Sequence, residues 1–245
     1  MLPRLWLAVV LFVLLLAGSC APAQPAEPTQ EPSQVVTQAV KNIRGASSFR
    51  LNVERTGADY FFQTDVGNVL FRRATAQYVA PNTLQGKLRV IIAGLPADVS
   101  IFARGTDQWF SNDVLTGGHW SHKPLTPGFN PEFLIDSDGG FQAAVSALHD
   151  LAYLGEEMLD SGASAQHFKA KANGPEIGGL LANLVQFAGA VTVDVFVDPK
   201  VFLPIRFVVV EPDSVTTKQP APLTFTIDIY DVNAAPQLDD PQKKS

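Results

Sequence analysis

Three groups of polar residues have types and spacings that could do chemistry. His119 and His122 form an H-x-x-H pair, and imidazole nitrogens are common metal ligands. The pair lies in a predicted hairpin without a Glu at metalloprotease spacing, so we interpret both as exposed turn histidines. The segment Asp136-Ser137-Asp138-Gly139 begins like a calcium loop, but the later ligands and the closing Glu are missing. An acidic cap for a helix beginning at Gly140 is favoured instead, and we expect neither a metal nor a cofactor.

The third group is the pair Glu156-Glu157, which could suggest acid and base catalysis. Adjacent residues of a strand point to opposite faces, so these two carboxylates cannot act together. No G-x-S-x-G elbow, P-loop or G-x-G-x-x-G motif follows any predicted strand. The sequence therefore predicts no catalytic residue, and we expect a protein that is not an enzyme.

The chain's single cysteine, Cys20, has a specific chemical interpretation. It follows Ala17-Gly18-Ser19 at the end of an apolar run from Leu5 to Leu16, which is about 12 residues long and too short for a bilayer span of ~20. Small residues before this cysteine resemble the bacterial lipobox, although Ala17 stands where a lipobox usually has Leu. Residues 1–19 are thus predicted to be a lipoprotein signal peptide, and Cys20 to receive a diacylglycerol and a palmitate. An ordinary secretory signal is the alternative.

Composition divides the remainder of the chain into three parts. Residues 20–33 form a Pro-rich linker, residues 34–233 a folded domain, and residues 234–245 a polar tail that we expect to be disordered. The whole chain has 245 residues, with 18 Lys plus Arg against 24 Asp plus Glu and a net charge of -6. This acidic balance disfavours nucleic-acid binding, and it means that membrane attachment would depend on acyl chains rather than on charge.

Periodicity predicts mainly β-structure in the folded domain. Apolar residues spaced by three and four indicate a helix over 35–43, with Ser33 as its N-cap and Gly45 at its end. Two further helices are expected over 140–151 and 176–187. Strands with one apolar and one polar face are expected over 49–53, 69–79, 84–92, 99–103, 109–110, 119–121, 151–159, 165–172, 191–197, 205–209 and 223–229. This pattern is typical of a single α+β domain with a strongly curved antiparallel sheet.

The order of these elements resembles the LppX/LprG-type bacterial lipoproteins, within the LolA/LolB-like group. The resemblance is carried by Cys20 with its linker, the helix over 35–43, the strand at Trp109-Phe110 with Trp120 in its partner, and the hairpin over 153–162 that leads to Phe168. It implies a half-open, U-shaped barrel with helices packed in the concave face and an apolar cavity for acylated lipids. We interpret both tryptophans as core or cavity-rim residues.

The resemblance also implies a function: a lipid-anchored protein at the outer face of a bacterial cytoplasmic membrane that binds and carries acyl lipids or glycolipids. An envelope transporter or another lipoprotein is a possible partner, and we expect a monomer. Many amphipathic strands face few helices, so some apolar surface should stay uncovered. The alternatives are a LolA/LolB-like chaperone for lipoproteins and a tethered module filled by its own side chains. The candidate cavity residues are Leu88, Val90, Ile92, Val99, Ile101, Val193, Val195, Phe207, Phe225 and Ile227.

Overall fold

A computed structural model describes residues 30–64, 67–124 and 128–243. The predicted signal peptide, Cys20 and most of the predicted linker lie outside these residues. The first described helix, α2, spans Pro32–Arg44, with Glu31 as its N-cap and Gly45 as its C-cap. The sequence predicted Ser33 as the N-cap, but the N-cap is two residues earlier, and Pro32 begins the helix because its fixed φ suits the first turn. Val36, Val40 and Ile43 form the buried stripe of α2.

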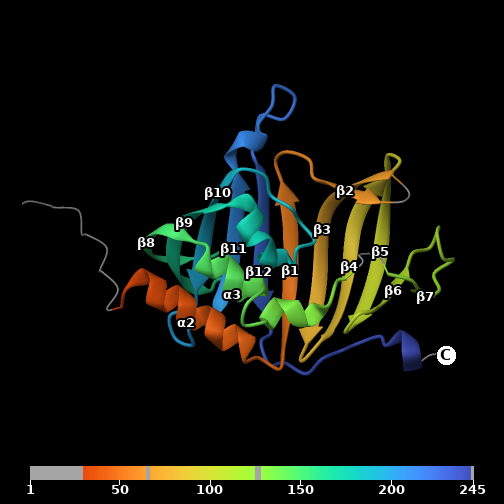
Figure 1. Ribbon diagram of the computed structural model, residues 1–245, viewed down its shortest axis with the longest axis horizontal. Helices are drawn as coiled ribbons and strands as arrows, with labels where there is room; N and C mark the ends of the chain where they lie inside the picture. The colour runs from red at the N-terminus through yellow and green to blue at the C-terminus, as the bar shows by residue number, and fades with distance from the viewer. Residues whose placement is uncertain (1–29, 65–66, 125–127, 244–245) are drawn as a thin grey trace, which may run out of the picture.

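Twelve antiparallel strands form one sheet, which confirms the predicted fold class. The spatial order is β7-β6-β5-β4-β3-β1-β12-β11-β10-β9-β8, with β2 paired to β3 outside this path, so the described sheet has two free edges and does not close (Figure 1). The strands are β1 Ser48–Thr56, β2 Phe61–Thr64, β3 Gly67–Val79, β4 Thr83–Ile92, β5 Leu95–Arg104, β6 Asp107–Ser111, β7 Ser121–His122, β8 His149–Met158, β9 Ser164–Asn173, β10 Ala190–Val197, β11 Pro204–Glu211 and β12 Leu223–Tyr230.

The middle of the chain supplies short helices rather than the two long ones that were predicted. α3 spans only Gly140–Ser146, and the segment predicted to be helical over 176–187 is the 3-10 helix η2 over Gly174–Leu181. Another 3-10 helix, η1, spans Pro131–Ile135. η2 ends early because Ala182 and Asn183 both take left-handed backbone angles, with φ of 51° and 59°. Two single-turn helices, η3 Pro212–Ser214 and η4 Pro241–Lys243, complete the described secondary structure.

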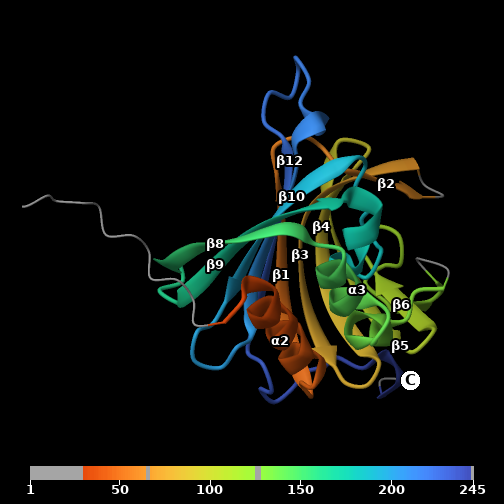
Figure 2. The same cartoon turned by 60° about the vertical axis from the view of Figure 1, so that its left-hand side comes forward.

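The helices α2, α3, η1 and η2 lie on one face of the sheet (Figure 2). α2 contacts β8, β10 and β11, η2 contacts β9, and α3 packs on both α2 and η2. η1 contacts β4 and lies beside α3. Helices therefore cover the half of the sheet from β8 to β12, whereas β4 and β5 have no helix in front of them over most of their length (Figure 1). We call the first half the covered half and the strands β3 to β6 the open half.

An aromatic cluster lies in the core where the covered half meets β3 of the open half. Phe225 is fully buried, and its ring stacks on Phe71 at 5.7 Å and meets Tyr60 and Phe187 edge-on at 5.6 and 5.5 Å. The Tyr60 hydroxyl accepts a hydrogen bond from the backbone N–H of Gln186 at 2.9 Å. This bond and these rings tie the segment after β1 to the loop before β10, so the cluster joins the two halves of the sheet.

Residues 234 to 243, for which the sequence predicted disorder, run along the convex face. The backbone N–H groups of Gln237 and Asp239 donate to the side chains of Gln77 and Gln85, at 3.2 and 2.7 Å. The carboxylate of Asp240 pairs with Arg104 at 2.7 Å and is largely buried. Composition alone could not indicate this contact, because a polar segment is ordered here by specific hydrogen bonds rather than by apolar burial.

Glu211, at the end of β11, places a buried carboxylate beside the core. Its Oε1 accepts a hydrogen bond from the backbone N–H of Ala188 at 3.1 Å, and burial raises its pKa above the ordinary value although this bond acts in the opposite direction. A raised pKa means that the folded state holds the proton more tightly than the unfolded state. Stability contributed by Glu211 is thus lost as pH rises from the ordinary carboxyl pKa through the folded pKa.

We expect Glu211→Gln to raise the melting temperature at pH 7 and to leave it nearly unchanged near pH 4. The amide keeps an oxygen that can accept from Ala188 but carries no charge, so only the pH-dependent cost disappears. Thermal unfolding of both proteins at the two pH values measures this, with Glu54→Gln on the exposed face as the control. An equal rise in melting temperature at both pH values would contradict the conclusion that burial of the charged Glu211 carboxylate is the cause.

Candidate functional site

All ten candidate cavity residues lie on the concave face of the sheet. Directly paired residues of antiparallel strands share a face, and the register makes one continuous row across eight strands. Residues two or four positions along a strand from a member of this row lie on the same face, which places the other five candidates. The row reads Phe168, Val195, Phe207, Ile227, Val53, Ala74, Leu88 and Val99.

Burial falls along this row from the covered half to the open half. Phe168, Val195, Phe207 and Ile227 have no exposed surface, Val53 is 7% exposed, and Ala74, Leu88 and Val99 are only half-buried. Val193 and Phe225 are fully buried as well, so the five candidates of β10 to β12 are packed in the core against the helices. Of the five candidates in β4 and β5, Val90 is buried and the others are partly exposed: Leu88, Ile92, Val99 and Ile101.

Small side chains line the floor of the open half. Ala76 pairs with Gly86, and Gly86 pairs with Ile101 on the same concave face. A Cβ at Gly86 would lie 3.1 Å from the carbonyl oxygen of Thr75 and 3.3 Å from Cγ1 of Ile101, so little room exists for a side chain within this row. The side chain of Ile101 therefore lies close to the backbone at Gly86, and the floor here is apolar.

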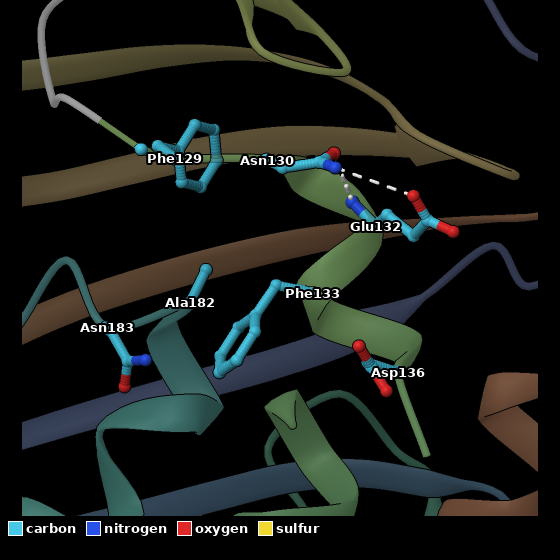
Figure 3. A pocket seen from close by; sticks show the side chains of 8 residues that line it. Phe129, Asn130, Glu132, Phe133, Asp136, Ala182 and Asn183 are labelled. Atoms are coloured by element: carbon cyan, nitrogen blue, oxygen red, sulfur yellow. Dashed lines mark hydrogen bonds between the residues drawn. The ribbon is translucent and has the colours of Figure 1, made fainter. Parts of the chain in front are cut away.

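A pocket of about 460 Å³ lies where η1 faces the end of η2 (Figure 3). The rings of Phe129 and Phe133 and the methyl group of Ala182 form its apolar part, and strands of the sheet pass behind it. Because η1 also contacts β4, the pocket borders the open half. Its polar lining residues are Asn130, Glu132, Asp136 and Asn183. Pockets of ~300–1,000 Å³ typically hold small ligands, and the volume of this one lies within that range.

Two neighbouring residues at one wall of this pocket have left-handed backbone angles. Ala182 has φ of 51° and Asn183 has φ of 59°, a region that L-residues with a Cβ seldom occupy. The first of the two residues caps η2, and its N–H donates to the carbonyl of Gly179 at 3.1 Å. Strained residues of this kind are frequent at binding sites.

We expect Ala182→Gly to stabilise the fold by about 1 kcal/mol, since glycine takes a left-handed angle without the penalty of a Cβ. Chemical denaturation of the two proteins measures the change. Ala144→Gly in α3, where the backbone is helical, is the matched control and should lower stability by a similar amount or more. A loss of stability in Ala182→Gly would show that the methyl group contributes more by packing than it costs by strain.

The polar groups singled out in the sequence do not form a reactive site. His122 stacks on Trp109 at 4.5 Å and lies 3.4 Å from Asp107, while Trp109 also packs on Phe102; these groups belong to the convex face. Asp136 accepts a hydrogen bond from the backbone N–H of Asp138 at 3.0 Å, whereas the N-cap of α3 is Gly139 and not an acidic side chain. Within residues 30–64, 67–124 and 128–243, no cluster of three His, Cys, Asp or Glu side chains could hold a metal ion.

Glu157 also has a structural rather than a paired catalytic position. It lies 3.3 Å from Nδ1 of His167, whose Nε2 is 2.8 Å from Asp194 and whose ring stacks on Phe196 at 4.3 Å. Glu157 thus makes a surface contact with His167 on the convex side rather than with Glu156. Sequence reasoning did not identify the pocket residues Phe129, Phe133 and Ala182, because they come from irregular segments without a periodic pattern.

Comparison of sequences does not assign the chain: no protein-family model matches it, and no curated protein matches it. Comparison of structures does find matches. Lipoprotein LppX of Mycobacterium tuberculosis has 16% sequence identity and a TM-score of 0.56, with 85% of this chain and 98% of LppX covered. LprF of Mycobacterium bovis has 14% identity and a TM-score of 0.61, with 87% of this chain and 98% of LprF covered. The chain has the LppX-type fold. This confirms the fold that the sequence resemblance implied.

In this LppX-type fold the concave face has a covered half and an open half, and the pocket borders the open half. Among the described residues, no helix is both long and apolar enough to cross a membrane. The predicted lipidation at Cys20 lies outside the described residues.

Proposed function

We propose that this protein is a lipid-anchored bacterial lipoprotein that binds acylated lipids or glycolipids on the open half of its concave face and carries them within the cell envelope. The observation that supports binding is the decline in burial along the row from Phe168 to Val99. Apolar side chains on a concave surface that no described helix covers are the feature expected of a site for acyl chains. The bound region comprises Leu88, Ile92, Val99 and Ile101, together with the adjoining pocket.

An apolar site without reactive groups is sufficient for a carrier. Moving an acyl chain from water to such a surface gains ~0.8 kcal/mol per buried CH₂, and the chain gains about the same in a bilayer. The affinity of a carrier for the acyl chain therefore has to equal that of the membrane and need not exceed it. Exchange of the lipid with a bilayer then stays possible. Acylation of Cys20, removal of residues 1–19 and an extracytoplasmic location complete the proposal, because they would keep the binding face near a membrane that supplies lipid.

The test is native mass spectrometry with solvent extraction on residues 21–245, secreted by a bacterial host and purified without detergent. This chain contains every described helix and strand. A lipid that copurifies at one or a few molecules per chain would support the proposal. A mass that corresponds to protein alone, unchanged after incubation with lipid vesicles, would overturn it and favour a module whose interior is filled by its own side chains. Loading only by an acylated peptide would favour the LolA/LolB-like chaperone.

A further inference from the structure

The pocket between η1 and η2 has an acidic edge whose lining includes no basic residue, although Arg44 donates to the carbonyl of Ile135 beside it at 2.9 Å. Glu132 and Asp136 are both exposed, and no Lys or Arg is among the eight residues that line the pocket. Neither carboxylate forms an ion pair with another residue of the part of the chain that the structure describes. The pocket thus places two negative charges next to the open half of the concave face.

Each of these two carboxylates has one oxygen that accepts no hydrogen bond from the described residues. Oε2 of Glu132 accepts a weak bond from the Asn130 amide at 3.4 Å, and Oδ1 of Asp136 accepts from the backbone N–H of Asp138 at 3.0 Å. Within the described residues, Oε1 of Glu132 and Oδ2 of Asp136 have no protein donor. An ionised carboxylate is only an acceptor, so a ligand at this edge has to bring donors.

The opposite side of the pocket is apolar and aromatic. Figure 3 shows the Phe133 ring between Ala182 on one side and Asp136 on the other, with the amide of Asn183 pointing toward the ring. The side chain of Asn183 forms no hydrogen bond with another described residue. An aromatic face next to carboxylates and an amide suits an ammonium group, through cation–π attraction and ionic hydrogen bonds, or the face of a hydroxyl-bearing ring.

We infer that this pocket binds the headgroup of the lipid whose acyl chain lies on the open half, and that this headgroup carries hydrogen-bond donors and no net negative charge. The inference rests on the proposed function. Its chemistry is common to ammonium headgroups, such as ethanolamine, and to uncharged sugar headgroups. The headgroup of phosphatidylglycerol has a net negative charge because no ammonium balances its phosphate, so repulsion from Glu132 and Asp136 disfavours it.

The experiment compares lipid loading from vesicles in which two lipids with identical acyl chains compete. Residues 21–245 are incubated with equimolar phosphatidylethanolamine and phosphatidylglycerol, or with equimolar digalactosyl diacylglycerol and phosphatidylglycerol, and the bound lipid is quantified by native mass spectrometry. We expect about fivefold preference for the headgroup that is not anionic in at least one mixture, because two exposed carboxylates contribute ~1 kcal/mol in total. The two mixtures distinguish an ammonium from a sugar headgroup.

The double variant Glu132→Gln/Asp136→Asn should lose this preference between headgroups. Glu54→Gln/Glu156→Gln makes the same change in net charge at exposed positions away from the pocket, and it should keep the preference. Equal loading of phosphatidylglycerol in the wild type, or an unchanged preference in the double variant, would overturn the headgroup inference alone. Absence of any bound lipid in all proteins would overturn the proposed function itself.

Discussion

Replacing Val99 by Trp is expected to reduce lipid loading about tenfold without unfolding the protein. Val99 lies in β5 at the open end of the concave row, opposite Leu88, and is only half-buried. An indole at this position would occupy space above the apolar floor of the open half, where we place the acyl chain. Forcing extra volume into an occupied apolar site costs ~1–3 kcal/mol, and 1.4 kcal/mol corresponds to a factor of ten in affinity.

Loading is measured by native mass spectrometry after incubation with phospholipid vesicles, and folding by thermal unfolding of the same samples. Ser100→Trp is the matched control, because residue 100 is the next position of the same strand and points to the convex face. Loading should be normal in Ser100→Trp and low in Val99→Trp. If both variants load like the wild type, the lipid does not lie on β5, and the proposed lining is wrong.

Replacing Phe225 by Ala is expected to lower the free energy of unfolding by about 3–5 kcal/mol. This residue has no exposed surface, and its ring contacts Phe71, Tyr60 and Phe187 at centroid distances of 5.5 to 5.7 Å. Alanine would lose the transfer free energy of the ring and leave a cavity that three rigid aromatic rings cannot fill easily. Urea denaturation followed by tryptophan fluorescence and circular dichroism measures the difference.

Tyr230→Ala provides the comparison for Phe225→Ala. Tyr230 ends the same strand, pairs with Arg50 on the opposite face and is 41% exposed, so its loss should cost ~0.5 kcal/mol or less. A loss below 1 kcal/mol in Phe225→Ala would mean that the covered half tolerates a cavity. In that case the contrast between the covered half and the open half of the concave face would no longer hold.

Most strands could be predicted from the sequence because their two faces have different environments. Val191, Val193 and Val195 alternate with the polar residues Thr192 and Asp194 in β10, and β9 and β12 repeat this pattern. The same alternation placed all ten candidate residues on one face, and the register confirms that they share it. The short strand β2 was missed because its pattern of burial does not alternate: three of its four residues are exposed and one is half-buried.

The helical segments were harder to predict, since their ends depend on local backbone geometry. The apolar spacing over 176–187 suggested a long helix, but Gly178 lies so close to Asn183 that a Cβ would be 2.8 Å from its side-chain oxygen. Gly178 permits this close approach because it has no Cβ, and the chain turns at Ala182 with left-handed angles, which leaves η2 short. Composition likewise could not predict that residues 237 to 240 have a defined position. That position depends on hydrogen bonds to Gln77 and Gln85, which lie side by side on neighbouring strands.

The sequence by itself determined the antiparallel strands, their apolar face and the absence of a recognisable catalytic motif, because these follow from residue types and a period of two. Only the tertiary structure decided which part of that face is filled. Phe207 and Val99 have the same apolar pattern in their strands, yet helices cover the first and leave the second partly exposed. Burial of this kind depends on where distant segments pack, and a strand's own sequence does not encode which of its neighbours will cover it.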